Sequence, residues 1–541
     1  MDDEKGKQKL ESRLALSRVL PAALAIFCLH VAEELAVTRL VFGTPLPVVT
    51  KHLFIDDILI DWEHSRNARL MVNPPRVVGR ILQLEEPFEK KLGLHYFSQV
   101  LEFEGHYRLY YRLIVEDPPK ERRVLNCVAI STDGIRWEKP NLGLVPLEGA
   151  KINNCIQTLS PTGGFLVVDP LAPPEKRFKE IGPLASGNFG VAGCGRDGLR
   201  FFPEEVTLLP FRCDTQNVVL WDDEKQKFIF FLRGWKDGIR SVLRAESTTL
   251  DQPLLFAPRQ KPFRKWADAF ALTTEFPCVL QPDAEDWKHW GDGKPGGVDI
   301  YNSSALKYPY APNTYLAFPS IYYHYSRITS PAAVSSNDGE LEVQLAVSRD
   351  SFHWTRYRTP YVSRGNYDGP DLRIVCMTQG IIRRGDKLLQ YFIGLPRSHG
   401  WAAFLLGTWG KFLDVPHRLK AWEESDQGGI YLAVQRVDGF VYLGAGEEVA
   451  TVVTKPFSFA GRHLYVNVSS VEGFLKVALA GEDGTPFPGK GLADCDVIRV
   501  DSIRHKVTWQ GNASVEKYLG KPVRLILQLK LGRLYSFEFA E

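Results

Sequence analysis

Cysteine pairs, histidine clusters and an excess of one charge are all missing from this chain of 541 residues. None of the eight cysteines stands in a CxxC pair or at zinc-binding spacing from a histidine. This argues against a structural zinc site, and so low a cysteine density argues against a disulfide scaffold. The 66 Lys and Arg residues nearly balance the 64 Asp and Glu residues, which leaves a net charge of +2 without any dense basic run. The charge therefore does not indicate nucleic acid as a partner.

Long apolar runs are scarce as well. The mainly apolar segment 19–32 follows five basic residues and has the length of a secretory signal core. It is shorter than a membrane-spanning helix requires. Four acids in the same N-terminal stretch, and His30 inside the run, fit a docked N-terminal helix instead. We expect residues 1–50 to be a signal or anchor of a secreted or cell-envelope protein, with an intracellular location as the alternative. Membrane contact is expected only through this segment.

Helical periodicity is nearly absent. From residue 52 onward, apolar and polar residues alternate over short runs bounded by Gly, Asp, Asn and Pro, which is the pattern of half-buried strands. The 45 Gly and 35 Pro residues supply the turns that many short strands need. The sequence therefore predicts an all-β protein.

Two themes repeat along the chain. The first is a polar opening, an apolar strand, a tight turn and an aromatic-rich strand, found at residues 97–112, 214–233, 299–322 and 377–394. The second is an Asp turn followed by an aromatic residue, found at residues 131–137, 195–201 and 348–354. β-rich units repeated at this spacing are typical of propeller blades, whose innermost strands gather around one axis. The aspartate of each Asp turn is expected to fix the turn through bonds to backbone nitrogens.

Counting these units predicts a five-bladed β-propeller over residues 51–418, with the strand at 52–60 available to close the ring against the last blade. Residues 419–428 are charged and form a predicted linker. Residues 429–541 show strands at intervals of about 8–12 residues joined by Gly, Asp and Pro turns, which predicts a two-sheet β-sandwich of jelly-roll type.

Several of these segments resemble a known group of proteins. The segments are LFIDDILI at 53–60, STDGIRWEKPNL at 131–142, DTQN at 214–217, DIY at 299–301 and SRDSFHW at 348–354. Together they resemble bacterial five-bladed propeller proteins related to glycoside hydrolase families 32, 43 and 68, which act on furanosides, arabinosides and xylosides. The C-terminal segments TKPFS, GEDGTPFPG, DCD and VTWQ resemble the β-sandwich appended in this branch. The chain lacks the invertase-type Asn-Asp-Pro opening, so the resemblance does not identify the proton donor.

Acidic residues at strand starts are the candidates for catalysis. Glycoside hydrolysis needs one carboxylic acid to protonate the departing oxygen and one carboxylate to attack the sugar or activate water. Asp214 and Asp299 fit best, because each begins the first strand of a blade and is followed by uncharged hydrogen-bonding residues. The predicted contacts for sugar hydroxyls lie on the same strands: Gln216, Asn217, Tyr301 and Asn302.

A third carboxylate is expected from the strand at 52–60. Adjacent strand residues point to opposite faces, so only one of Asp56 and Asp57 can face the cavity, and Asp57 is the predicted one. Glu275 and Asp371 are reserve acids that would suit a proton donor. The histidines are isolated in sequence and are expected to be packed or surface residues. No redox cofactor and no metal are assigned.

The sequence thus predicts a carbohydrate-active protein, with an oligo- or polysaccharide as substrate and a glycoside hydrolase as the first hypothesis. The alternative is a non-catalytic glycan-binding or scaffold propeller, whose axial acids would grip hydroxyls. A sialidase-like enzyme is disfavoured, because that class needs an arginine cluster and usually six blades. Three axial acids around one sugar ring would favour the enzyme, and acids held in backbone networks would favour the binder.

Overall fold

The computed structural model describes the chain from residue 46 to residue 541. Short segments within this range are excluded from the description: 118–120, 148–149, 151–152, 162, 212, 215, 257–270, 273–275, 291–294, 326–337, 401–419 and 421–423. Helices in the described part are α2 (Pro87–Leu92) and α3 (Ala284–His289), with 3-10 turns η1 (Pro174–Lys176) and η4 (Glu516–Tyr518). None of the helices described is long and apolar enough to cross a membrane. Nearly all other elements are strands, so the all-β prediction is confirmed.

Between residues 76 and 436 the described strands form five antiparallel groups, the first three of which follow chain order. Group one contains β6 (Leu94–Phe103), β7 (His106–Asp117) and β8 (Glu121–Ser131). Group two contains β9 (Phe165–Val168), β10 (Phe178–Pro183), β11 (Phe189–Gly195) and β12 (Phe202–Leu209). Group three contains β13 (Val218–Asp222), β14 (Lys227–Lys236), β15 (Ile239–Ser247) and β17 (Cys278–Leu280), with β16 (Ala271–Leu272) parallel to β14.

The last two groups share one large sheet through a parallel bridge between Leu341 and Ile374. Group four contains β18 (Val298–Asn302), β21 (Ser320–His324), β22 (Gly339–Ser348) and β23 (Trp354–Val362), with β19 (Leu306–Lys307) and β20 (Tyr315–Ala317) at its side. Group five contains β24 (Ile374–Met377), β26 (Lys387–Leu395), β27 (Gly429–Arg436) and β5 (Arg76–Gln83), with β25 (Ile382–Arg384) on β26.

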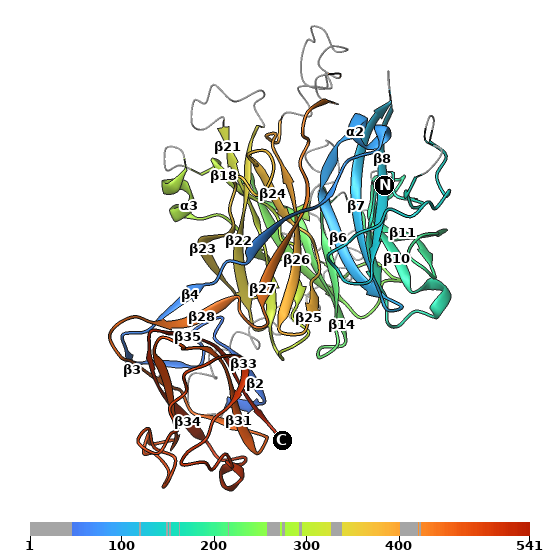
Figure 1. Cartoon of the computed structure of the whole chain (residues 1–541). Coiled ribbons are helices and arrows are strands. Elements are labelled where there is room, and N and C mark those ends of the chain that lie inside the picture. Colours follow the sequence, from blue (N-terminus) through green and yellow to red (C-terminus); the bar gives the residue numbers. More distant parts are fainter. Residues whose placement is uncertain are drawn as a thin grey trace, which may run out of the picture.

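Apolar clusters join these groups in cyclic order. Each cluster contains buried residues from two neighbouring groups: Val128 with Phe178, Ile181 with Phe228, Ile229 with Ile321, Val343 with Phe392, and Ile393 with Leu109. The last pair returns from group five to group one, and a parallel bridge between Gln99 and Gln379 reinforces that contact. Because every sheet buries both faces against its neighbours, the ring is closed by apolar packing. This cyclic order is that of a β-propeller, which Figure 1 shows beside the sandwich.

The remaining strands form a two-sheet sandwich. One sheet contains β1 (Leu46–Val49), β30 (Phe457–Phe459), β34 (Val523–Lys530), β29 (Ala450–Thr454), β3 (Ile60–Arg66) and β32 (Phe474–Gly481). The other contains β33 (Asp501–Lys506), β31 (His463–Ser469), β35 (Gly532–Ala540), β28 (Val441–Ala445), β4 (Arg69–Val72) and β2 (Lys51–Leu53). Their inner faces enclose one apolar core that includes Trp509, Phe457 and Phe537.

The N-terminal strands belong to the sandwich and not to the propeller ring. β2 pairs with β35, β3 with β29 and β4 with β28, so the strand expected to close the ring lies among C-terminal strands (Figure 1). The last blade is completed instead by β27, expected in the sandwich, and by β5, which pairs with β27. Alternation identifies a strand and its buried face, but the partner strand depends on packing between segments far apart in sequence.

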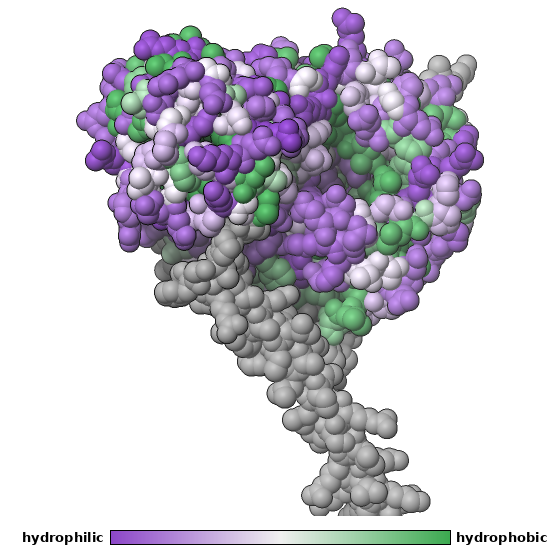
Figure 2. Space-filling model, turned by 90° about the horizontal axis from the view of Figure 1, so that it is seen from below, coloured by the Kyte–Doolittle hydropathy of each residue, from purple (hydrophilic) through white to green (hydrophobic). Residues whose placement is uncertain are grey.

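The propeller and the sandwich meet around one buried acid. Asp438 accepts hydrogen bonds from the Tyr308 hydroxyl at 2.8 Å and the Ser536 hydroxyl at 3.1 Å, and Lys51 lies 2.7 Å away. Tyr308 comes from the propeller, whereas Ser536 and Lys51 lie in sandwich strands. Seen from below, polar residues cover most of both parts, and apolar residues gather in a hollow beside their junction (Figure 2).

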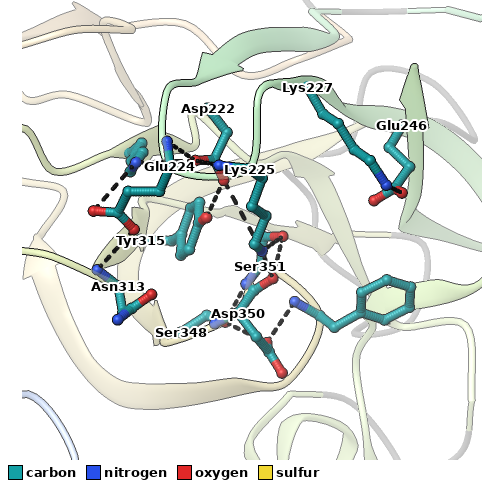
Figure 3. Close-up of polar contacts among 12 residues, drawn as sticks. Asp222, Glu224, Lys225, Lys227, Glu246, Asn313, Tyr315, Ser348, Asp350 and Ser351 are labelled. Atoms are coloured by element: carbon teal, nitrogen blue, oxygen red, sulfur yellow. Dashed lines mark hydrogen bonds and ion pairs between the residues drawn. The ribbon is translucent and has the colours of Figure 1, made fainter. Parts of the chain in front are cut away.

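The repeated Asp turns have the structural role that the sequence predicted. In each, the Asp Oδ1 atom accepts from the backbone nitrogens two and three residues later at 2.7–3.0 Å. The turn of group four also anchors its neighbour, because Lys225 donates to the Asp350 carbonyl and the Ser351 hydroxyl (Figure 3). On the same side, the Tyr315 hydroxyl donates to Asp222. These contacts lock the hairpin of blade three onto blade four.

Candidate functional site

Asp299 is the centre of a buried polar cluster at the end of the propeller away from the sandwich. It lies in β18, opposite Tyr322 of β21, and is 4% exposed. Its Oδ2 atom accepts from Arg240 Nη1 at 2.5 Å and lies 2.8 Å from His324 Nε2. Its Oδ1 atom accepts from the Arg240 backbone nitrogen at 3.2 Å. Both carboxylate oxygens are therefore engaged.

These contacts set the charge of Asp299. Burial raises the pKa of the carboxyl, but the hydrogen bond with His324 and the positive charge of Arg240 outweigh burial and bring the pKa below its usual value. The group therefore stays ionised at neutral pH. A permanently ionised, fully bonded carboxylate suits a fixed charge that positions its neighbours, and it does not suit a proton donor.

Asp214 comes from another blade and shares one neighbour with Asp299. Burial lowers the pKa of the Arg233 guanidinium to about 10, and the charge of Arg240 adds to this effect. Asp214, Tyr301 and Asp299 act in the opposite direction on the same group. Arg233 donates to the Tyr301 carbonyl, and its guanidinium lies 4.8 Å from the centre of the Tyr301 ring. Both predicted acids therefore act electrostatically on one arginine, and Asp214 is half-buried.

Aromatic and histidine rings line the same place. The Tyr301 hydroxyl lies 3.0 Å from His399 Nε2, and His399 stacks on Tyr96 with 5.5 Å between ring centres. Tyr322 lies against His324 at 4.0 Å. Burial raises the pKa of Tyr301 to about 12, and the charge of Asp214 adds to the shift. Hence these phenols are neutral and can only act through hydrogen bonds and ring contacts.

We call this set the mouth cluster: Tyr96, Asp214, Arg233, Arg240, Asp299, Tyr301, Tyr322, His324 and His399. The sequence identified its two acids and Tyr301, but it did not group the histidines or the arginines with them. The position of His324 could have been predicted from hairpin pairing. The second strand of a blade pairs with the first, Asp299 pairs with Tyr322, and His324 lies two residues further along the same strand, on the same face.

The other predicted contact residues lie deeper along the axis. Gln216 donates to the Ser98 carbonyl at 3.4 Å, which links blade three to blade one. Asn217 accepts from the Arg233 backbone nitrogen at 2.7 Å and thereby shapes the strand. Asn302 is 3% exposed, and within the described part of the chain neither of its side-chain polar atoms has a hydrogen-bond partner meeting standard geometry. Of the predicted contacts, only Tyr301 belongs to the mouth cluster.

The expected third acid is not brought to the mouth. Asp56 pairs with Arg349 at 2.7 Å, and the exposed Asp57 accepts from Trp62 at 3.2 Å. β22 begins opposite His324 and ends next to Arg349, and its length places these acids about 30 Å from Asp299. The physical reason is the pairing of the N-terminal strands with the sandwich.

The two reserve acids have different outcomes. Glu275 lies outside the described residues. Asp371 is exposed and, among the residues described, forms no ion pair. Where the structure is described, the ligand-like group Asp61, Glu63 and His64 lies on β3 of the sandwich, where Arg524 already pairs with Asp61. We assign no metal to it.

Comparison with known proteins gives a likeness to solved structures only. No protein-family model and no curated protein matches the chain. A structure described as a glycoside hydrolase aligns over 67% of this chain and 92% of its own, with 11% identity and a TM-score of 0.41. The catalytic domain of the Coprinopsis cinerea GH62 α-L-arabinofuranosidase aligns over 67% and 97%, with 11% identity and a TM-score of 0.39. A glycosyl hydrolase from Bacteroides ovatus aligns over 68% of this chain and 94% of its own, with 11% identity and a TM-score of 0.39. These solved structures are of the kind that the sequence motifs resemble.

Proposed function

We propose that the protein is a glycoside hydrolase that acts on an oligo- or polysaccharide at the mouth cluster. The observation that supports the proposal is that Asp214 and Asp299, from two different blades, both act electrostatically on the buried Arg233. Paired carboxylates beside rings and hydrogen-bond donors are what sugar hydrolysis requires. The tyrosine rings offer faces for a sugar, and the arginines offer donors for its hydroxyls.

The two acids take different roles because their surroundings differ. Asp299 is buried and ionised, with every oxygen engaged, so it holds Arg240 and His324 in place. Asp214 is half-buried, so it is the carboxylate that can reach the sugar. In this role it attacks the anomeric carbon or takes a proton from the attacking water.

A non-catalytic glycan-binding propeller is the second candidate. The specific observation in its favour is that Asp299 is saturated by Arg240 and His324, as an acid in a purely structural network would be. The tyrosine rings of the mouth cluster could then bind a sugar without cleaving it. This candidate predicts saturable glycan binding without the release of any shorter product.

Turnover by matched variants separates the two. The wild type, Asp214→Asn and the control Asp371→Asn would be screened on aryl-glycosides and on plant and algal glycans. The hydrolase proposal expects turnover by the wild type and the control, and a loss of at least about 100-fold in Asp214→Asn. Equal turnover by all three would remove Asp214 from the mechanism. Binding by calorimetry without turnover in any of them would establish the binder.

A further inference from the structure

Among the described residues of the mouth cluster, no acid is left to give up a proton once Asp214 attacks the sugar or activates water. Asp299 is held ionised, and Asp57 lies at the other end of the propeller. If Asp214 acts as nucleophile or base, it cannot also protonate the departing oxygen in the same step. The remaining side chains with an exchangeable proton near neutral pH are histidines, because the tyrosines keep their protons.

His324 is the histidine that the structure holds in a fixed orientation. It ends β21, and its ring Nε2 lies 2.8 Å from Asp299 Oδ2. Its carbonyl accepts from Trp290 Nε1 at 2.9 Å, and its backbone nitrogen donates to Gly297 at 3.0 Å. The ring also packs at a tilt against Tyr322, with centres 4.0 Å apart and planes at 43°. Within the described part of the chain, no group bonds the second ring nitrogen, Nδ1.

We propose that His324 is the proton donor of the hydrolysis, acting through Nδ1 while Asp299 holds Nε2–H. This inference rests on the proposed function. As the bond between the anomeric carbon and the leaving oxygen breaks, the Nδ1 proton passes to that oxygen, which departs as an alcohol. Water supplies a hydroxyl to the anomeric carbon and its other proton to Asp214. Solvent then returns a proton to His324 and takes one from Asp214, which restores the starting state.

Two charged side chains from neighbouring strands lie on the Nε2 side of the His324 ring. Asp299 on β18 faces Nε2, and a carboxylate in this position stabilises an imidazolium and fixes the tautomer. Arg240 on β15 shares the same carboxylate oxygen and opposes this effect. The buried acid Asp338 stands beside Gly339, which pairs with His324 across β22, and Tyr322 is neutral. Asp299 and Arg240 are thus the charged side chains next to Nε2, and Asp338 accepts from the backbone nitrogens of Gly339 and Gly400.

Leaving-group chemistry tests this role. A general acid is needed for a poor leaving group and hardly needed for a good one. The wild type, His324→Gln and the control His399→Gln would be assayed on the phenyl and dinitrophenyl glycosides of one sugar. We expect His324→Gln to lose at least about 100-fold in kcat/KM on the phenyl glycoside and less than about 10-fold on the dinitrophenyl glycoside. His399→Gln should lower both by a similar factor.

Two outcomes would overturn the proposal. Equal losses on both substrates in His324→Gln would mean that the ring only supports the site. A wild type that hydrolyses neither glycoside would remove the proposed function as well, so the two failures are distinguishable. A measurement on the unmodified protein covers the case in which the variant does not fold. The apparent pKa of the alkaline limb of the wild-type pH–rate profile should shift strongly with temperature, because imidazole ionises with a large enthalpy. If a carboxyl group were the proton donor, the same apparent pKa would hardly shift with temperature.

Discussion

Replacing Asp299 by asparagine should destabilise the propeller more than any surface charge change. The side chains of Asp299 and Arg240 are 5% and 16% exposed, so the guanidinium would be left without its counter-ion in a poorly solvated place. Removing one partner of a buried ion pair typically costs about 3–5 kcal/mol, because the other charge stays buried. We expect the free energy of unfolding of Asp299→Asn to fall by about that amount at pH 7.

The loss should depend on pH in one direction. The pKa of Asp299 is lowered in the folded protein, so the carboxylate contributes stability that is fully present above the pKa of an aspartate in the unfolded chain, about 4. That contribution disappears as the pH falls through the lower pKa that Asp299 has in the folded protein. The difference between wild type and Asp299→Asn should therefore be constant from about pH 5 to 8 and should narrow below about pH 4.

Calorimetry and urea unfolding across this pH range would measure the effect. Glu285→Gln is the matched control, because Glu285 and Lys288 form an ion pair at 61% and 69% exposure, which should contribute nothing measurable. The double variant with Arg240→Gln should regain part of the lost stability, since no charge is then left unpaired. A change below about 1 kcal/mol for Asp299→Asn, or a difference that widens in acid, would refute the reasoning.

Three further predictions concern other parts of the chain. Asp438→Ala should cost about 3–5 kcal/mol and separate the calorimetric transitions of propeller and sandwich, because it strands Lys51 at their junction; a single unchanged transition would contradict this. Refolding in a glutathione redox buffer should join Cys127 and Cys155, whose Sγ atoms lie 3.3 Å apart, with two thiols oxidised and glutathione disulfide reduced. Peptide mass mapping would show the link, and unlinked peptides would argue against it. Asp350→Ala should lose about 1 kcal/mol of stability and Asp350→Asn less, because an amide oxygen can still accept from the turn nitrogens.

Some features of this protein follow from the sequence alone. Period-two alternation and turn residues are local properties, so they predicted strands, hairpins and the all-β class. The Asp turns are equally local, because the aspartate bonds to nitrogens two and three residues away. Asp214 and Asp299 could be selected because each lies at or shortly before the first strand of a blade: Asp214 precedes β13, and Asp299 is the second residue of β18.

Tertiary structure alone decided which strands pair and which side chains meet. A strand pattern does not name its partner, so the sequence could not show that β2 and β3 join the sandwich or that β27 and β5 complete the last blade. That pairing removed Asp57 from the mouth. Likewise His324 and Arg240 reach Asp299 from neighbouring strands through cross-strand register and blade packing. Contacts of this kind join separate strands and depend on how the ring closes, so the local sequence around each residue does not predict them.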